Sequence, residues 1–196
     1  MRRARRLQLV TVVWMSGEAI LALAAAWKAG SPALLGFGGD SAIELLSALV
    51  VFWRFRSKAD SESIRAEKLA ARIAGALLFA VAGFVLLASA AALLGYREPQ
   101  PSAVGIVVLI AAALGMPVLA FQKRKLAAQL SSSSLRADAA QSSLCGYLSW
   151  IALAGLLANA FLHLPWADSA AALLLVPFVA KEGWATIRSA QLGCDC

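Results

Sequence analysis

The chain has 196 residues, of which 61% are hydrophobic and 15% charged, with a formal net charge of +7 and a mean hydropathy of +0.75. A water-soluble domain carries about 25% charged and 45–50% apolar residues, so this composition predicts a polytopic membrane protein. The basic residues lie between apolar segments, where orientation signals belong, and so the positive charge does not indicate a nucleic-acid-binding protein. The three cysteines are an odd and sparse set, which excludes a disulfide framework.

Six segments have the ~20 apolar residues that crossing a bilayer requires. They are residues 7–28, 34–55, 72–94, 103–122, 130–162 and 166–188. The N-terminus has the layout of a signal peptide, but its apolar part has span length and contains Trp14 and Glu18, so we expect a retained first helix. The mixed-charge connection 57–72 is rich in helix formers and is expected to extend the helices beside it. The predicted fold is an all-α membrane bundle of six transmembrane helices, residues 1–188, followed by a short cytoplasmic tail, residues 189–196.

The distribution of lysine and arginine predicts the orientation of these spans. One side of the membrane would hold Arg2, Arg3, Arg5, Arg6, Arg54, Arg56, Lys58, Arg65, Lys68, Arg72, Lys123, Arg124, Lys125, Arg136, Lys181 and Arg188. The other side would hold only Lys28 and Arg97. The positive-inside rule therefore places both termini in the cytoplasm and three short, proline-containing turns outside.

The second span contains two carboxylates, Asp40 and Glu44, one helical turn apart and so on one face of a helix. Acids inside a membrane helix are costly, and two ionised ones repel each other, so a metal ion or protons are expected to compensate them. Carboxylate oxygens bind divalent cations and lose affinity when they are protonated. The alternative is a pair of neutral acids that are hydrogen-bonded inside the bundle.

Three spans bring an acid to a similar depth. At 1.5 Å per residue, Glu18 lies ~18 Å from Arg6, Asp40 ~21 Å from Arg54 and Asp138 ~20 Å from Lys125. We therefore expect Asp138 to join Asp40 and Glu44, while Glu18 is either a helix–helix contact or a proton relay. Asp168 stands at the predicted start of the sixth helix, and we interpret it as an acid that the helix macrodipole favours.

The fifth span carries a polar stripe. Ser134, Asp138, Gln141, Ser142 and Cys145 follow the spacing of one helix face. Their side chains can complete the coordination shell of a cation, but small polar residues also serve helix packing in membranes, and a buried cysteine is more often a packing residue. At the end of the chain, the C-D-C sequence of Cys194 and Cys196 is either a capture site for a soft metal or a frayed tail.

Signatures of an enzyme are absent from the sequence. It contains no Gly-rich phosphate loop, no paired-cysteine zinc site and no Ser–His–Asp set at membrane depth, so we expect neither enzymatic activity nor a resident cofactor. Three glycines beside Asp40, at positions 36, 38 and 39, are expected to serve close helix packing rather than nucleotide binding.

The segment GFGGDSAIELLSALVVFWRFR resembles the second helix of the cation diffusion facilitator family of divalent metal-ion/proton antiporters, which carries two acids four residues apart. The segments SLRADAAQSSLCGYLSW and WADSAAALLL resemble the fifth and sixth helices of that family, with Ser169 in place of a proline. The resemblance implies that Asp40, Glu44 and Asp138 bind the metal and exchange protons, with Ser134, Gln141, Ser142, Glu18 and Cys145 as weaker candidates. The resemblance also implies a homodimer. We expect the protein to lie in a bacterial inner membrane.

Two features depart from the family pattern. The family often has His-x-x-x-Asp in its fifth helix, and Ser134 stands at the position assigned to the histidine. Because serine is a poor zinc ligand, this departure argues against a zinc-selective tetrahedral site and leaves Zn, Mn, Fe(II) and Co as candidates. Many family members also have a cytoplasmic domain after the sixth helix, and we expect this chain to be a short form without it.

The sequence thus predicts a transporter that exports a divalent transition-metal ion by proton antiport with alternating access. One alternative is a proton-coupled transporter of organic cations, which an aromatic-lined cavity would support. The other is a membrane scaffold or metal-sensing accessory that transports nothing. Saturable metal binding separates the first hypothesis from both alternatives.

Overall fold

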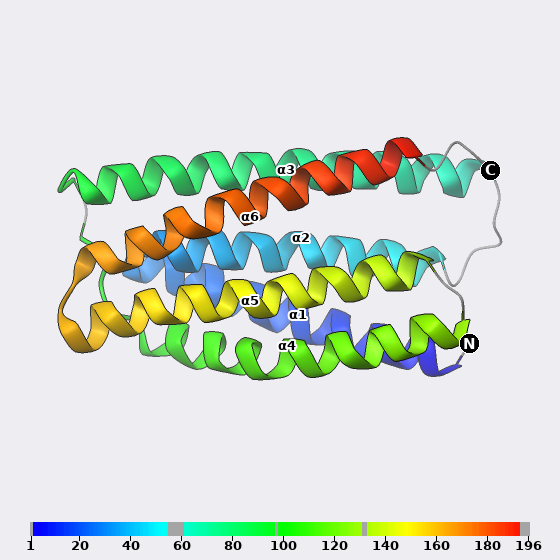
Figure 1. The fold of residues 1–196 in the computed structure, drawn as a ribbon, viewed down its shortest axis with the longest axis horizontal. Coiled ribbons are helices and arrows are strands. Elements are labelled where there is room, and N and C mark those ends of the chain that lie inside the picture. The colour runs from blue at the N-terminus through cyan, green and yellow to red at the C-terminus, as the bar shows by residue number, and fades with distance from the viewer. Residues whose placement is uncertain (1, 55–60, 97, 131–132, 193–196) are drawn as a thin grey trace.

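The computed structural model describes residues 2–54, 61–96, 98–130 and 133–192. It contains the helices α1 (Arg2–Ala29), α2 (Pro32–Arg54), α3 (Ser61–Leu93), α4 (Ala103–Leu130), α5 (Ser133–Leu162) and α6 (Pro165–Leu192). The described residues form no strand, so the predicted all-α, six-helix fold is confirmed. The helices run along one common axis, with the start of α1 and the end of α6 at the same end of the bundle (Figure 1). We call this the terminus end, and the opposite end, where α1 meets α2 and α5 meets α6, the short-loop end.

Five of the described helices are long and apolar enough to cross a membrane. Their spans are Arg6–Ala29, Arg72–Leu93, Ala103–Gln129, Asp138–Leu162 and Pro165–Arg188. Their outward faces expose large apolar side chains such as Val13, Phe121 and Trp27, the last 85% exposed. A water-soluble monomer rarely exposes an apolar surface of this extent, whereas lipid chains cover it without cost. The chain is therefore an integral, multi-pass membrane protein.

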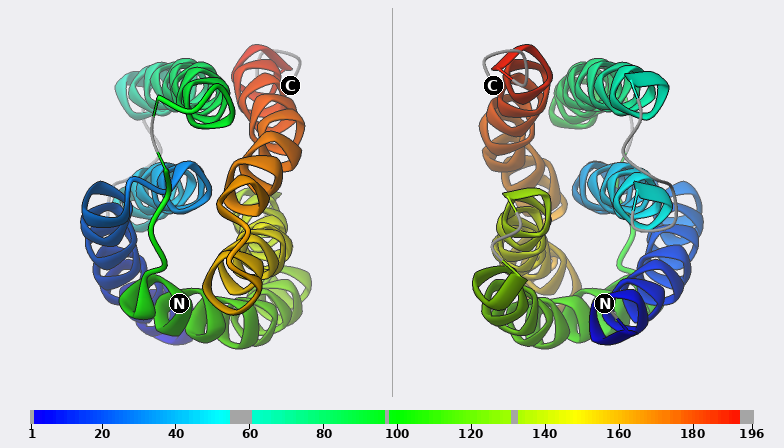
Figure 2. Two further views of the ribbon diagram at one scale, coloured as in Figure 1. Left: turned by 90° about the vertical axis from the view of Figure 1, so that its left-hand side faces the viewer. Right: turned by 90° about the vertical axis from the view of Figure 1, so that its right-hand side faces the viewer.

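Helix α2 packs against four of the other helices. It contacts α1, α3, α5 and α6, and the end-on views show it between α1 and α3, with α5 and α6 across from it (Figure 2). Its 23 residues extend ~35 Å, which is enough to cross a hydrocarbon core of about 30 Å. This packing keeps Asp40 and Glu44 buried and away from lipid.

Glycines allow the neighbouring helices to approach α2 closely. A Cβ atom at Gly38 would lie 3.0 Å from Leu23 of α1, and one at Gly39 would lie 2.8 Å from Val81 of α3. Gly36 likewise faces Val85 of α3, where an added Cβ atom would meet a methyl group at 3.3 Å. The prediction that these glycines serve helix packing is therefore confirmed.

Replacing Gly39 by valine is expected to destabilise the bundle by about 1–3 kcal/mol, because the new side chain overlaps a β-branched residue that has little freedom to move. Thermal unfolding in detergent would measure the effect. The matched control is Gly83→Val on α3, where an added Cβ atom meets nothing within 4 Å. Equal stability of the two variants would contradict the close contact between α2 and α3.

At the short-loop end, the buried carboxylate of Asp168 connects the first turns of two helices. Asp168 lies in the first turn of α6, accepts a hydrogen bond of 2.7 Å from Ser31 Oγ and accepts one of 3.4 Å from the backbone N–H of Ala33. Ser31 Oγ in turn accepts a hydrogen bond of 3.1 Å from the backbone N–H of Leu34, and so caps α2. The acid therefore stands at two positive helix ends rather than at one, and it holds α2 in place relative to α6.

The predicted end of the fourth span at residue 122 is wrong, because α4 continues to Leu130. The sequence QKRKLAAQL that follows residue 121 consists of good helix formers, so nothing stops the helix where the charges begin. Lys123 consequently lies within α4 and is fully buried, not in a connection at the membrane surface.

Candidate metal-binding site

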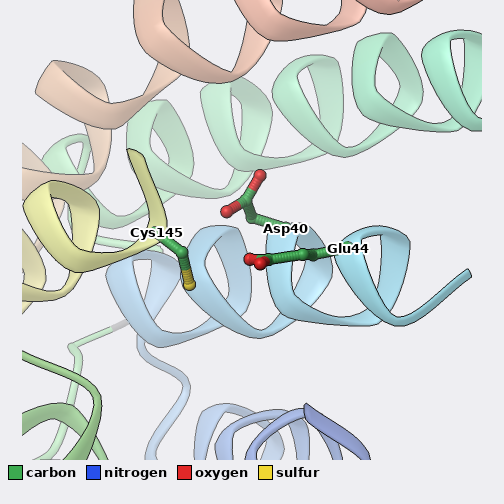
Figure 3. A group of neighbouring side chains, drawn as sticks. All are labelled: Asp40, Glu44 and Cys145. Carbon is green, nitrogen blue, oxygen red and sulfur yellow. The ribbon is translucent and has the colours of Figure 1, made fainter. Parts of the chain in front are cut away.

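The buried acids of α2 meet a cysteine of α5. Asp40 and Glu44 are 4% and 3% exposed, and Cys145 is fully buried. One ligand atom from each of these three residues lies within 4.8 Å of the other two. Figure 3 shows the two acids on adjacent turns of α2, with the Glu44 carboxylate extended toward the Cys145 thiol of α5. We call these three residues the acid–thiol group.

The spacing of the acid–thiol group is close to that of ligands on one metal ion. Ligand atoms 2.0–2.3 Å from a tetrahedral ion lie roughly 3.3–3.8 Å from one another. The observed separation of up to 4.8 Å therefore requires a closing movement of about 1 Å, which side-chain rotation supplies. Two carboxylates and a thiolate would carry three negative charges, so a divalent cation is a better match than a monovalent one.

Asp40 is surrounded by other carboxylates. The carboxylates of Glu182, Glu44 and Glu18 act on it electrostatically. Glu182 lies on α6, is 7% exposed and accepts a hydrogen bond from the side chain of Gln141. A buried carboxylate that is surrounded by other acids is expected to bind a proton or a metal ion.

Glu18 is held in place by side chains from three helices. Its Oε2 accepts a hydrogen bond of 2.7 Å from the Trp14 indole of its own helix. Its Oε1 accepts one of 2.8 Å from Ser41 Oγ of α2 and lies 3.6 Å from Cys145 Sγ, which donates to it. Both oxygens are thus engaged, so Glu18 lies beside the acid–thiol group without belonging to it.

Glu44 is connected on its other side to a buried lysine. Its Oε1 accepts a hydrogen bond of 2.6 Å from Ser142 Oγ and lies 4.0 Å from Lys123 Nζ, while within the described chain its Oε2 has no hydrogen-bond partner. Lys123 Nζ donates to Ser142 Oγ at 2.7 Å and forms an ion pair of 3.0 Å with Asp138 Oδ2. Gln8 of α1 also donates to Asp138 Oδ2, at 3.1 Å.

The structure brings together part of the predicted site. Asp40, Glu44 and Cys145 form the acid–thiol group, and Glu18, Gln141 and Ser142 lie at its edge. Asp138 is paired with Lys123 and is not one of the three grouped ligands. The side chain of Ser134 and the residues Cys194 and Cys196 lie outside the described part of the chain.

Two residues of this region were missed from the sequence. Lys123 stands one position beyond the predicted end of the fourth span, in a run of three cations, and its neighbours Arg124 and Lys125 are exposed. Only its position on the inward face of α4 distinguishes it. Glu182 follows Lys181 within the predicted sixth span, so the general rule that an acid inside a span marks function would have selected it.

The family of the chain follows from its sequence over nearly the whole length. The family model described as the cation efflux transmembrane domain matches residues 9–192. The chain belongs to the cation efflux family. The resemblance to the cation diffusion facilitators is thereby confirmed, and the chain belongs to a family of cation transporters rather than to a family of enzymes.

A curated relative is also described as a transporter. Over 168 residues the chain is 26% identical to the uncharacterized transporter YdbO of Bacillus subtilis (strain 168). The match covers 82% of this chain and 58% of that protein. The chain thus spans a little over half the length of this relative.

Proposed function

We propose that this protein exports a divalent transition-metal ion across a bacterial inner membrane in exchange for protons. The observation that carries the proposal is the acid–thiol group, in which two buried carboxylates and a buried thiol meet on helices that are about 100 positions apart in the sequence. Membership of the cation efflux family supports a transported cation rather than a structural one. The family resemblance is also our reason for proposing a homodimer.

The ligand set favours ions of intermediate softness. Carboxylate oxygens suit hard cations such as Mg²⁺ and Mn²⁺, whereas a thiolate favours Zn²⁺ and other thiophilic ions. A site with both ligand types fits Zn²⁺, Fe²⁺ and Co²⁺ best, and Mn²⁺ less well. Gln141 and Ser142 can add neutral oxygen ligands, because both lie beside the group.

Proton exchange follows from the same residues. A metal ion binds only the deprotonated carboxylates and thiolate, so its binding releases protons and its release takes them up again. The Cys145 thiol already donates to Glu18, which gives its proton an acceptor when a metal ion takes the sulfur. Rocking of the helices around this fixed site would expose it first to the cytoplasm and then to the outside.

Transport in proteoliposomes tests this proposal. We expect Co²⁺ or Zn²⁺ to enter vesicles faster when their lumen is more acidic than the medium, since outward proton movement then drives metal uptake. A metal-sensitive dye inside and a pH-sensitive dye outside would follow the two fluxes together. Vesicles that contain the Asp40→Asn variant serve as the control.

The outcomes separate the parts of the proposal. Metal uptake without proton movement, and at the same rate with and without the pH gradient, would overturn proton antiport and leave metal transport. Absence of metal uptake by a folded protein at normal density in the vesicles would overturn transport of the ion, and would direct attention to organic cations or to a non-transporting role.

A further inference from the structure

Lys123 is a cation fully enclosed by the bundle. Its side chain is completely buried, although it was expected in a connection at the membrane surface. Its ammonium group lies 3.0 Å from Asp138 Oδ2, 2.7 Å from Ser142 Oγ and 4.0 Å from Glu44 Oε1. A buried ammonium requires such partners, because an unpaired charge in a medium of low dielectric constant is strongly unfavourable.

The surroundings of this ammonium group offer more acceptors than it uses. The second oxygens of the two carboxylates beside it, Glu44 Oε2 and Asp138 Oδ1, are buried, and within the described residues neither has a hydrogen-bond partner. The same holds for Gln8 Oε1, whose amide nitrogen donates to Asp138 Oδ2. The side-chain oxygens of Glu44, Asp138 and Gln8, together with Ser142 Oγ, form a set of hard oxygen donors from α1, α2 and α5. Such a set, with two carboxylates and two neutral oxygens, is the chemistry of a site for a hard divalent cation.

We infer that Lys123 occupies a second cation position, formed by Glu44, Asp138, Gln8 and Ser142, and that it keeps a second metal ion from binding beside the acid–thiol group. Lys123 is then a specificity-determining residue that limits the protein to one divalent ion at a time. That a limit of one divalent ion matters for transport rests on the proposed function. The existence of the second cation position does not rest on it.

The shared residue Glu44 explains why a tethered cation is useful here. Glu44 belongs to the acid–thiol group and to the position of Lys123. If two mobile divalent ions were bound on either side of one carboxylate, both would have to dissociate before the site could bind the next ion. An ammonium group on a helix stabilises Glu44 and Asp138 in every cycle without having to dissociate.

The inference is tested by counting the Mn²⁺ ions bound per chain at equilibrium in detergent, in wild type, Lys123→Ala and Lys123→Arg. We expect Lys123→Ala to bind one Mn²⁺ more than wild type, because truncation removes the resident charge and opens space for an ion. Lys123→Arg retains a cation and is expected to bind as wild type does. Lys123→Ala/Asp138→Asn lacks one of the two carboxylates and is expected to lose the additional ion.

A second double variant tests this inference independently of the proposed function. In Asp40→Asn/Lys123→Ala the acid–thiol group is impaired, and we expect the additional Mn²⁺ to remain. A folded Lys123→Ala variant that binds the same number of Mn²⁺ ions as wild type would overturn the inference, whatever that number is. If Lys123→Ala unfolds on extraction, Mn²⁺ added beforehand is expected to restore a monodisperse sample, and a failure to restore it would also overturn the inference.

Discussion

Replacing Asp40 by asparagine is expected to reduce the affinity for Zn²⁺ and Co²⁺ by more than ~100-fold, since even changes to residues behind the ligands cost about 10–100-fold in metal affinity. Asparagine has nearly the same shape but no charge, and Asp40 is surrounded by other acids. The substitution also removes one of several repelling charges, so the protein should fold as well as wild type or better. Titration calorimetry in detergent would measure the affinity.

The matched control for this variant is Glu98→Gln, which neutralises an exposed acid in the connection between α3 and α4. It is expected to leave metal binding unchanged. Wild-type affinity in a monodisperse Asp40→Asn sample would show that Asp40 is not a ligand. Equal loss in both variants would show that the measurement reports the total charge of the protein rather than a site.

Replacing Cys145 by serine is expected to change the preference among metals. A hydroxyl group is a poor ligand for Zn²⁺ compared with a thiolate, so the affinity for Zn²⁺ should fall by roughly 10–100-fold, as for other changes at metal sites. Binding of Mn²⁺, which prefers oxygen ligands, should change little. Competition between Zn²⁺ and Mn²⁺ on the same sample would measure the ratio of the two affinities directly.

The control for this change is Ser149→Ala on the same helix. Ser149 is also buried, but it donates its hydrogen bond to the backbone carbonyl of Gly146 within α5. We expect no change in metal preference in this variant. An unchanged ratio of Zn²⁺ to Mn²⁺ affinity in Cys145→Ser would exclude sulfur as a ligand. The neighbouring oxygens of Glu18 and Ser142 would then be the candidates for the third ligand.

Local sequence patterns were sufficient to predict the helices and the pair of acids in the candidate site. Long apolar runs can satisfy their backbone hydrogen bonds in lipid only as helices, and so the six helices were predictable one by one. Asp40 and Glu44 lie one turn apart on a single helix, so their meeting follows from helical geometry alone. The glycines before Asp40 were also interpretable, because small residues in membrane helices usually mark close contacts.

The predicted end of α4 failed for a physical reason. Charged residues usually mark the membrane surface, yet a lysine can remain inside a bundle when another helix supplies a carboxylate. Asp138 of α5 does this for Lys123 of α4. The two residues occupy neighbouring helices, and neither apolar periodicity nor charge counting shows that they face each other.

The assignment of α5 residues to the site depended on the same kind of contact. The polar stripe was predictable, because its members recur at helical spacing. A stripe, however, extends over several turns, and its residues lie at different depths. Packing against α2 places Cys145 with Asp40 and Glu44, while Asp138 lies about two turns away and meets Lys123.

By itself, the sequence determined that this protein is a six-helix membrane protein with a pair of acids on its second helix, because both properties depend on residues that are close together along the chain. Only the tertiary structure decided which cations and ligands accompany that pair. Cys145, Glu182 and Lys123 come from three other helices, and their positions beside Asp40 and Glu44 depend on how each helix is rotated and shifted against α2. Those rotations are set by packing at the helix–helix contacts, for which a single sequence carries no periodic signal.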